Sequence, residues 1–395
     1  MGNTYPPNRA SLASTLRRTL VCVTLLFGSL CGVPVVSAHG GAAYFPGVEQ
    51  WYALIPLLLG ILVVAGAVTV RRRRPAARVS HVLTVVFAGL VLAVIGAIAL
   101  VQLSPITSFS TTSRPFTTRT LTLVRLVLGG TVLVTSVTLA RRRWPMKPRY
   151  AGLGLLFGGW FLYPILLRDF QPGFNPIGYL LFATLVFSVG YIAWRDCRHA
   201  IRTLCTDPIT RRFGAAVSVL TAVFFMFSAG ILIMLPDPSG VGITWTQSFV
   251  HVLPVKDPLV YWPAVEFWFP QLPLGGYLSV GMLTLVLIIS LLVGLNGAIV
   301  AYQWRCQSTV GFDGATGAAA IAAPNACCCC GPVLSQLAVV ALGPSAAMPF
   351  YWLFIDTASP LGVLFFTGSI VLLLGNLVRF SAALAPTESL PEHTL

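Results

Sequence analysis

Four consecutive cysteines, Cys327 to Cys330, lie within an apolar stretch that is long enough to cross a membrane. Thiolates bind soft metal ions such as Hg(II) and Cu(I), and they also carry out thiol–disulfide exchange. A free cysteine packs as a small apolar residue. Packing alone accounts poorly for four in a row between Pro324 and Pro332. The cluster is therefore the main candidate for chemistry in this sequence.

The spacing within the cluster favours an ion with two thiolate ligands. In a helix, Cys327 and Cys330 lie three residues apart on one face, whereas Cys328 and Cys329 point in other directions. Two thiolates suit Hg(II) or Cu(I), whereas a structural zinc site needs spaced cysteine pairs. Cys327-x-x-Cys330 is also a redox spacing. Metal binding, redox exchange and the packing of small residues therefore remain three alternatives.

The residues around the cluster predict an interrupted helix. Pro324 and Pro332 each remove a helical hydrogen bond, and Gly331 adds flexibility beside the second proline. Interrupted helices occur inside membranes where the freed carbonyl groups face protein or water, and transporter sites are built in this way. We expect these three residues to shape a site at mid-membrane.

The stretch ACCCCGPVLSQLAVVALGPSAA resembles the first helix of mercuric-ion uptake permeases. That family carries a vicinal cysteine pair, one further residue, Gly-Pro, and then Ala-Leu-Gly with a small residue after it. The matching positions here are Cys328 and Cys329, Cys330, Gly331-Pro332 and Ala341-Leu342-Gly343. The resemblance implies that Cys328 and Cys329 receive a metal ion in the membrane and that an inner cysteine pair takes it next. It covers only this short part of the chain, and the motif lies in the penultimate span instead of the first.

Four further residues are candidate ligands for the ion. Cys306 is expected at the inner end of the preceding span, and Cys197 and Cys205 lie in a basic inner loop where they could form the inner pair. Cleavage before His39 would give that residue a free α-amine beside its imidazole, and nitrogen ligands suit Cu(II). We expect Cu or Hg as cargo, and the sequence identifies no resident cofactor.

Composition predicts an all-α, polytopic membrane protein. Of the 395 residues, 56% are hydrophobic and only 9% are charged, and the mean hydropathy is +0.84. An ordinary globular domain carries about 25% charged residues. Several apolar runs reach the roughly 20 residues that a spanning helix needs, and the alternating segments of a membrane β-barrel are absent.

The N-terminus is typical of a secretory signal. Three arginines precede the apolar run TLVCVTLLFGSLCGV, and Val36-Ser37-Ala38 is a suitable cleavage site. Residues 1–38 are therefore interpreted as a signal peptide, with an uncleaved first helix as the alternative. We expect residues 39–395 to form a single helical membrane domain, because no loop is long enough to hold a second core.

Nine apolar segments follow, and we predict that each forms a transmembrane helix. They cover residues 51–70, 81–103, 120–140, 151–167, 176–194, 213–235, 277–303, 314–343 and 360–378. The longest connection, 236–276, is rich in aromatic residues and proline. We interpret it as an interfacial or re-entrant outer loop.

Basic residues alternate between the connections and predict the orientation. Residues 71–78, 141–149 and 195–212, together with Arg305 and Arg379, contribute 17 basic side chains, whereas the opposite set of connections contains four. Basic loops remain in the cytoplasm, so we expect a cell-membrane protein with its mature N-terminus outside and its C-terminus in the cytoplasm. These loops account for the net charge of +14, so the expected partner is the lipid bilayer and no nucleic acid.

These features predict a permease or carrier for a soft metal ion of the Hg or Cu class. Two alternatives are a membrane thiol–disulfide oxidoreductase and a structural or accessory subunit of a membrane complex. The sequence contains no phosphate-binding loop and no zinc-protease motif. A carrier is therefore favoured over an enzyme, and the oxidoreductase alternative stays open.

Overall fold

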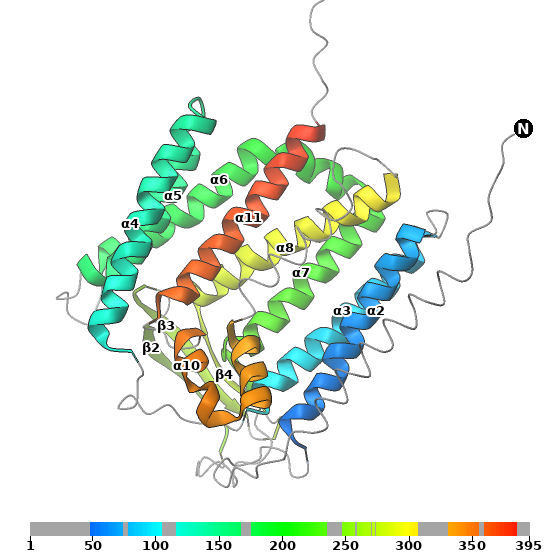
Figure 1. Cartoon of the computed structure of the whole chain (residues 1–395), viewed down its shortest axis with the longest axis horizontal. Helices are drawn as coiled ribbons and strands as arrows, with labels where there is room; N and C mark the ends of the chain where they lie inside the picture. Colours follow the sequence, from blue (N-terminus) through cyan, green and yellow to red (C-terminus); the bar gives the residue numbers. More distant parts are fainter. Residues whose placement is uncertain are drawn as a thin grey trace, which may run out of the picture.

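A bundle of apolar helices carries one small antiparallel sheet at one end (Figure 1). The computed structural model describes residues 48–73, 78–104, 116–166, 175–234, 247–256, 259–269, 271–272, 274–306, 331–354 and 359–384. The predicted signal peptide, His39, Pro324 and the cluster Cys327–Cys330 lie outside these residues.

The described residues contain seven helices that are long and apolar enough to cross a membrane, which confirms the all-α polytopic fold. They are α2 (Leu54–Arg73, preceded by the 3-10 turn η1, Gln50–Ala53), α3 (Val79–Gln102), α4 (Thr118–Arg143), α6 (Pro176–Thr206), α7 (Pro208–Ser228), α8 (Val280–Cys306) and α11 (Pro360–Leu384). The predicted segment 151–167 forms α5 (Pro148–Leu166). The predicted segment 314–343 is described only from Gly331, as a helix over Gly331–Leu342. A turn at Gly343, with φ of +83°, leads into α10 (Pro344–Phe354).

Polar side chains define where several helices begin. The hydroxyl of Thr117 accepts a hydrogen bond from the backbone N–H of Thr120 at the start of α4. Asn175 accepts one from Ile177 at the start of α6, and Asp207 ends α6 and caps α7. Each side chain satisfies one of the unpaired N–H groups in a first helical turn.

Helix packing relies on small residues and on one amide pair. A Cβ atom at Gly214 of α7 would lie 2.9 Å from the carbonyl oxygen of Gly294 on α8, so the two backbones nearly touch. Lipid gives little hydrophobic drive for helix association, so close backbone contact matters. Asn296 of α8 donates to the carbonyl of Leu373 on α11 at 3.1 Å, and Asn376 donates to the Asn296 side-chain oxygen at 2.6 Å. These bonds tie α8 to α11 within the membrane region.

The connection between α7 and α8 contains a sheet that the sequence did not predict. Strands β1 (Leu232–Met234), β2 (Phe249–Lys256), β3 (Tyr261–Phe269) and β4 (Leu274–Ser279) pair antiparallel in the order β1-β4-β3-β2. The predicted apolar segment 213–235 is accordingly divided, because α7 ends at Ser228 and β1 follows. The ring of Trp262 on β3 packs 5.1 Å from that of Phe182 on α6 and so attaches the sheet to the bundle.

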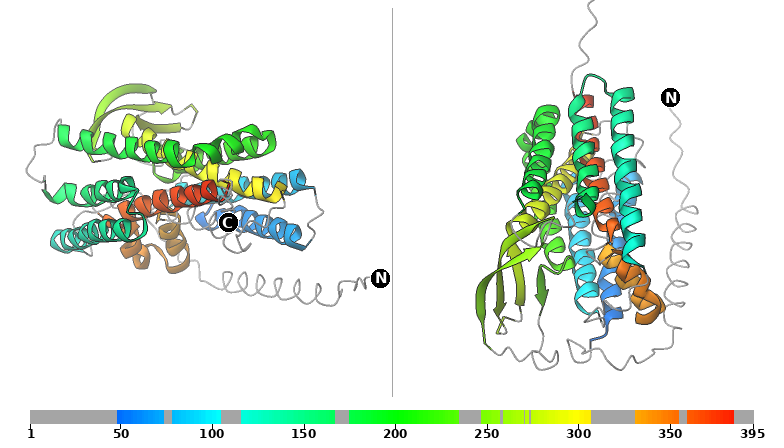
Figure 2. Two further views of the ribbon diagram at one scale, coloured as in Figure 1. Left: turned by 90° about the horizontal axis from the view of Figure 1, so that it is seen from above. Right: turned by 90° about the vertical axis from the view of Figure 1, so that its left-hand side faces the viewer.

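The sheet lies at the opposite end of the bundle from the C-terminal ends of α4, α8 and α11 (Figures 1 and 2). The basic residues at the ends of α2, α4 and α8 gather at that second end. We call it the basic end, and the end with the sheet the sheet end.

Candidate functional site

The chain that follows the cysteine cluster packs with one side against the bundle near the sheet end. Gly331 is buried, and a Cβ atom there would lie 3.4 Å from the side chain of Phe354. Val333 packs against Ala97, Ile98 and Phe224, which lie within two turns of the ends of α3 and α7. The predicted site residues Gly331 and Pro332 are therefore in the first described turn of a helix that contacts α3, α7 and α10 on one side and exposes Leu334 on another.

Hydrogen bonds fix this turn in place. Ser335 and Gln336 are almost fully buried, with 0% and 1% of their surface exposed. The Ser335 hydroxyl donates to the carbonyl of Gly331 at 2.7 Å. The amide of Gln50 in η1 donates both to the side-chain oxygen of Gln336 and to the carbonyl of Leu100, each at 2.8 Å. Buried polar groups are expensive in a membrane unless they are paired, so these bonds hold the turn at a defined position.

The two cysteines of α6 do not form an inner pair. Cys197 is fully buried among core residues that include Ile192 and Leu204, whereas Cys205 is exposed. Eight residues separate them along the helix, a distance of about 12 Å. Cys197 therefore has the surroundings of a packing residue.

Cys205 and Cys306 lie at one corner of the basic end. Arg305 at the end of α8 forms an ion pair with Asp207 between α6 and α7. Cys306 directly follows Arg305, Cys205 precedes Asp207 by two residues, and both thiols are exposed. Within the described ranges, no three metal-ligating side chains come together. The corner thus offers two accessible thiols and no preformed metal cage.

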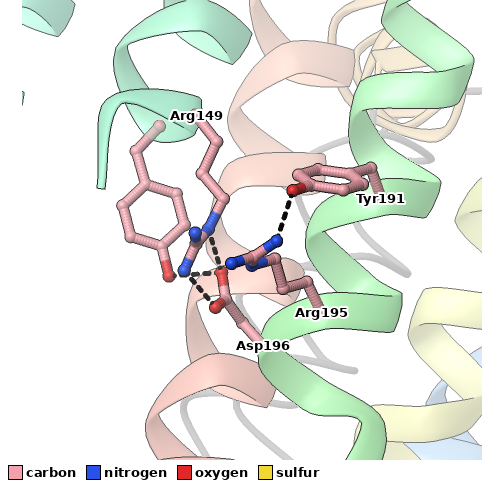
Figure 3. Close-up of polar contacts among 5 residues, drawn as sticks. Arg149, Tyr191, Arg195 and Asp196 are labelled. Carbon is pink, nitrogen blue, oxygen red and sulfur yellow. Dashed lines mark hydrogen bonds and ion pairs between the residues drawn. The ribbon is translucent and has the colours of Figure 1, made fainter. Parts of the chain in front are cut away.

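A partly buried ion pair at the basic end was not predicted from the sequence. Arg149 at the start of α5 donates through Nε to Asp196 Oδ2 at 2.7 Å, and a second guanidinium nitrogen bonds the other oxygen (Figure 3). The Tyr150 hydroxyl donates to Asp196 Oδ2 at 2.9 Å. The one feature of the sequence that could have indicated this pair is the acidic residue Asp196 between Arg195 and Arg198. Both oxygens of Asp196 accept hydrogen bonds from Arg149 or Tyr150, so this carboxylate is not free to act as an acid or base. The ion pair joins α5 to α6.

The sheet carries one further pair of possible ligands. His251 on β2 lies opposite Glu266 on β3, and Nε2 is 2.9 Å from Oε2. The side chains are 51% and 41% exposed, so this surface contact contributes little to stability.

No family model, curated protein or solved structure matches this chain. The candidate site consists of the partly buried turn after the cysteines near the sheet end and the two exposed thiols at the basic end.

Proposed function

We propose that this multi-pass membrane protein is a permease or carrier for a soft metal ion, Hg(II) or Cu(I), and that Cys327–Cys330 bind the ion. One observation supports the proposal: the cysteines directly precede a turn, Gly331–Gln336, in which Gly331, Ser335 and Gln336 are buried and hydrogen bonds fix Ser335 and Gln336. Thiols that only filled space against lipid would need no such fixed, polar neighbour. The local resemblance to mercuric-ion uptake permeases supports mercury as the first ion to test.

The exposed thiols at the basic end supply an acceptor for the same ion. α8 is 27 residues long, about 40 Å, and ends at Cys306. The turn Gly331–Gln336 and these thiols lie toward opposite ends of the bundle, so in this proposal the ion leaves the cluster and crosses the bundle before it meets Cys306 and Cys205, which are accessible to water or to a soluble thiol. Cys197 is assigned to packing. Capture of Cu(II) by His39 on the outer side remains a separate prediction.

Uptake by a variant with all four cluster cysteines changed to serine tests the proposal. Cells expressing the wild type should accumulate radiolabelled Hg(II), or Cu(I) under reducing conditions, and the four-serine variant should fall to the background of empty cells. The matched control is Cys197→Ala, which removes a thiol from the core and should retain most uptake. Expression and monodispersity of all three proteins are compared in detergent. Equal uptake by the wild type and the four-serine variant would exclude the proposal.

The two alternative functions predict other results. An oxidoreductase requires a Cys327–Cys330 disulfide that forms and breaks reversibly, which alkylation and mass spectrometry detect. An accessory subunit requires that four alanine substitutions leave assembly and phenotype unchanged. Purified protein with bound metal that disappears in the four-serine variant would favour the carrier over both.

A further inference from the structure

Helix α6 has two opposite faces along its length. One face is buried against the bundle and includes Phe182, Leu185, Val189 and Ile192. The other face is exposed by 49–77% at its large side chains, Leu180, Phe187, Tyr191 and Trp194. Successive members of this set are seven, four and three positions apart, spacings that place them on one side of the helix. We call them, with Arg195 and Arg198, the exposed face of α6.

The exposed face changes from apolar to aromatic to basic along the helix. From Pro176 to Trp194 the helix covers 19 residues, or about 28 Å, which matches a hydrocarbon core of about 30 Å. Tyr191 and Trp194 have the side chains that gather at membrane interfaces. Arg195 and Arg198 follow at once and so lie at the depth of lipid phosphates.

Aromatic rings orient both arginines on this face. The guanidinium of Arg195 donates to the Tyr191 hydroxyl at 2.9 Å and lies 5.9 Å from the centre of the Tyr191 ring (Figure 3). Arg198 lies 5.9 Å from the centre of the Trp194 ring. Cation–π contacts at this distance, together with the hydrogen bond to Tyr191, restrict the two guanidinium groups and leave their remaining N–H groups available.

Among the described residues, no carboxylate forms an ion pair with either of these two arginines. Asp196 lies between them in the sequence but turns to Arg149 and Tyr150 on the neighbouring helix (Figure 3). Arg202, one turn further along, is also exposed. The positive charge therefore faces outward from the bundle, beside an apolar surface.

We propose that the exposed face of α6 binds one anionic phospholipid. Its phosphate bonds Arg195 and Arg198, and one acyl chain lies along Phe187 and Leu180. A guanidinium fork matches phosphate oxygens, whereas the positive headgroup of phosphatidylcholine would meet the exposed Arg202. This interaction is separate from the proposed metal transport and does not depend on it.

Native mass spectrometry of the full-length protein in detergent tests the proposal. Dioleoylphosphatidylglycerol and dioleoylphosphatidylcholine are titrated separately, and the occupancy of the first bound lipid is measured. The wild type should bind the glycerol lipid at least tenfold more tightly. Arg195→Gln/Arg198→Gln should weaken that binding about twenty-five-fold, since each arginine near an anionic headgroup contributes a factor of about five. Both arginines are exposed, so the fold should be unaffected.

Two control variants separate a defined site from diffuse charge. Arg141→Gln/Arg142→Gln removes the same charge from exposed positions at the end of α4 and should change binding less than twofold. Tyr191→Leu/Trp194→Leu keeps both charges and should weaken binding several-fold by releasing the guanidinium groups. Equal losses from the two arginine double variants, or no preference for the anionic lipid in the wild type, would overturn the proposal.

Discussion

Asp196 is a nearly buried carboxylate whose charge is met by two partners on the neighbouring helix. Its side chain is 8% exposed and accepts hydrogen bonds from Arg149 and Tyr150, while the Arg149 side chain is 19% exposed. Removing one member of a buried pair costs about 3–5 kcal/mol, and partial exposure reduces that cost here. The partners are unequal: without Arg149 a buried carboxylate is left, whereas without Asp196 the guanidinium can still reach water.

Substitution of the pair should therefore give unequal and coupled effects. We expect Arg149→Gln to lower the midpoint of thermal unfolding more than Asp196→Asn. The double variant should lose less stability than the two single variants lose together, with a coupling energy of about 1–3 kcal/mol. Thermal unfolding of the four purified proteins in one detergent measures this cycle. Strictly additive losses would show that the two side chains act independently.

The sequence could not reveal this pair or the amide pair of Asn296 and Asn376. Arg149 and Asp196 are 47 positions apart in the sequence, and Asn296 and Asn376 are 80 positions apart. Which side chains pair is therefore decided by how the helices pack. The burial of Cys197 could not be predicted either. The sequence suggested a basic loop at this position, whereas α6 continues through it and packs Cys197 against the core. The apolar length of each span, in contrast, is a local property and was predictable.

At the scale of helices, α2 and α3 approach so closely that only glycine fits between them. A Cβ atom at Gly60 would lie 2.4 Å from the backbone nitrogen of Ala93, and one at Gly96 would lie 2.3 Å from that of Leu57. Gly66, on the same helix as Gly60, has no heavy atom within 4 Å of the equivalent position. The contact is thus made by particular glycines and not by the glycine content of the helix.

Gly60→Leu and Gly66→Leu form a matched pair of variants on α2. We expect Gly60→Leu to separate α2 from α3, with a thermal midpoint lower by several degrees or a loss of monodisperse protein, since overpacking costs about 1–3 kcal/mol. Gly66→Leu should behave as the wild type. Fluorescence-detected size-exclusion chromatography after a heating series measures both, and similar behaviour of the two variants would refute the close contact.

The sheet was missed because its strand signals are weakened by proline. Pro254 on β2 and Pro263 on β3 interrupt strands that are otherwise rich in Val, Phe and Trp. The register pairs these two prolines directly opposite each other, so the missing N–H groups fall on a single rung of the ladder. That pairing cannot be recognised until the register is known, and the aromatic residues alone indicated a membrane interface.

For the whole molecule, the gathering of basic helix ends opposite the sheet predicts which end faces the cytoplasm (Figure 1). Met146, between α4 and α5, is 89% exposed at the basic end, and Leu272, between β3 and β4, is 70% exposed at the sheet end. These two positions are suitable for labelling from either side of the membrane.

Single cysteines at these positions test the orientation. In a background with all nine native cysteines changed to serine, a membrane-impermeant maleimide should label Leu272→Cys in intact cells. It should label Met146→Cys only after permeabilisation, because the positive-inside rule retains the basic loops in the cytoplasm. The reverse pattern would invert the assignment of the two ends.

The junction between β4 and α8 has a mechanical consequence. Ser279 ends the strand and Val280 begins the helix, with no residue between them to act as a hinge. α8 is also the most enclosed of the seven candidate spans. A ligand or protein that tilted the sheet would therefore also tilt α8. The motion would reach Cys306 at the other end of that helix.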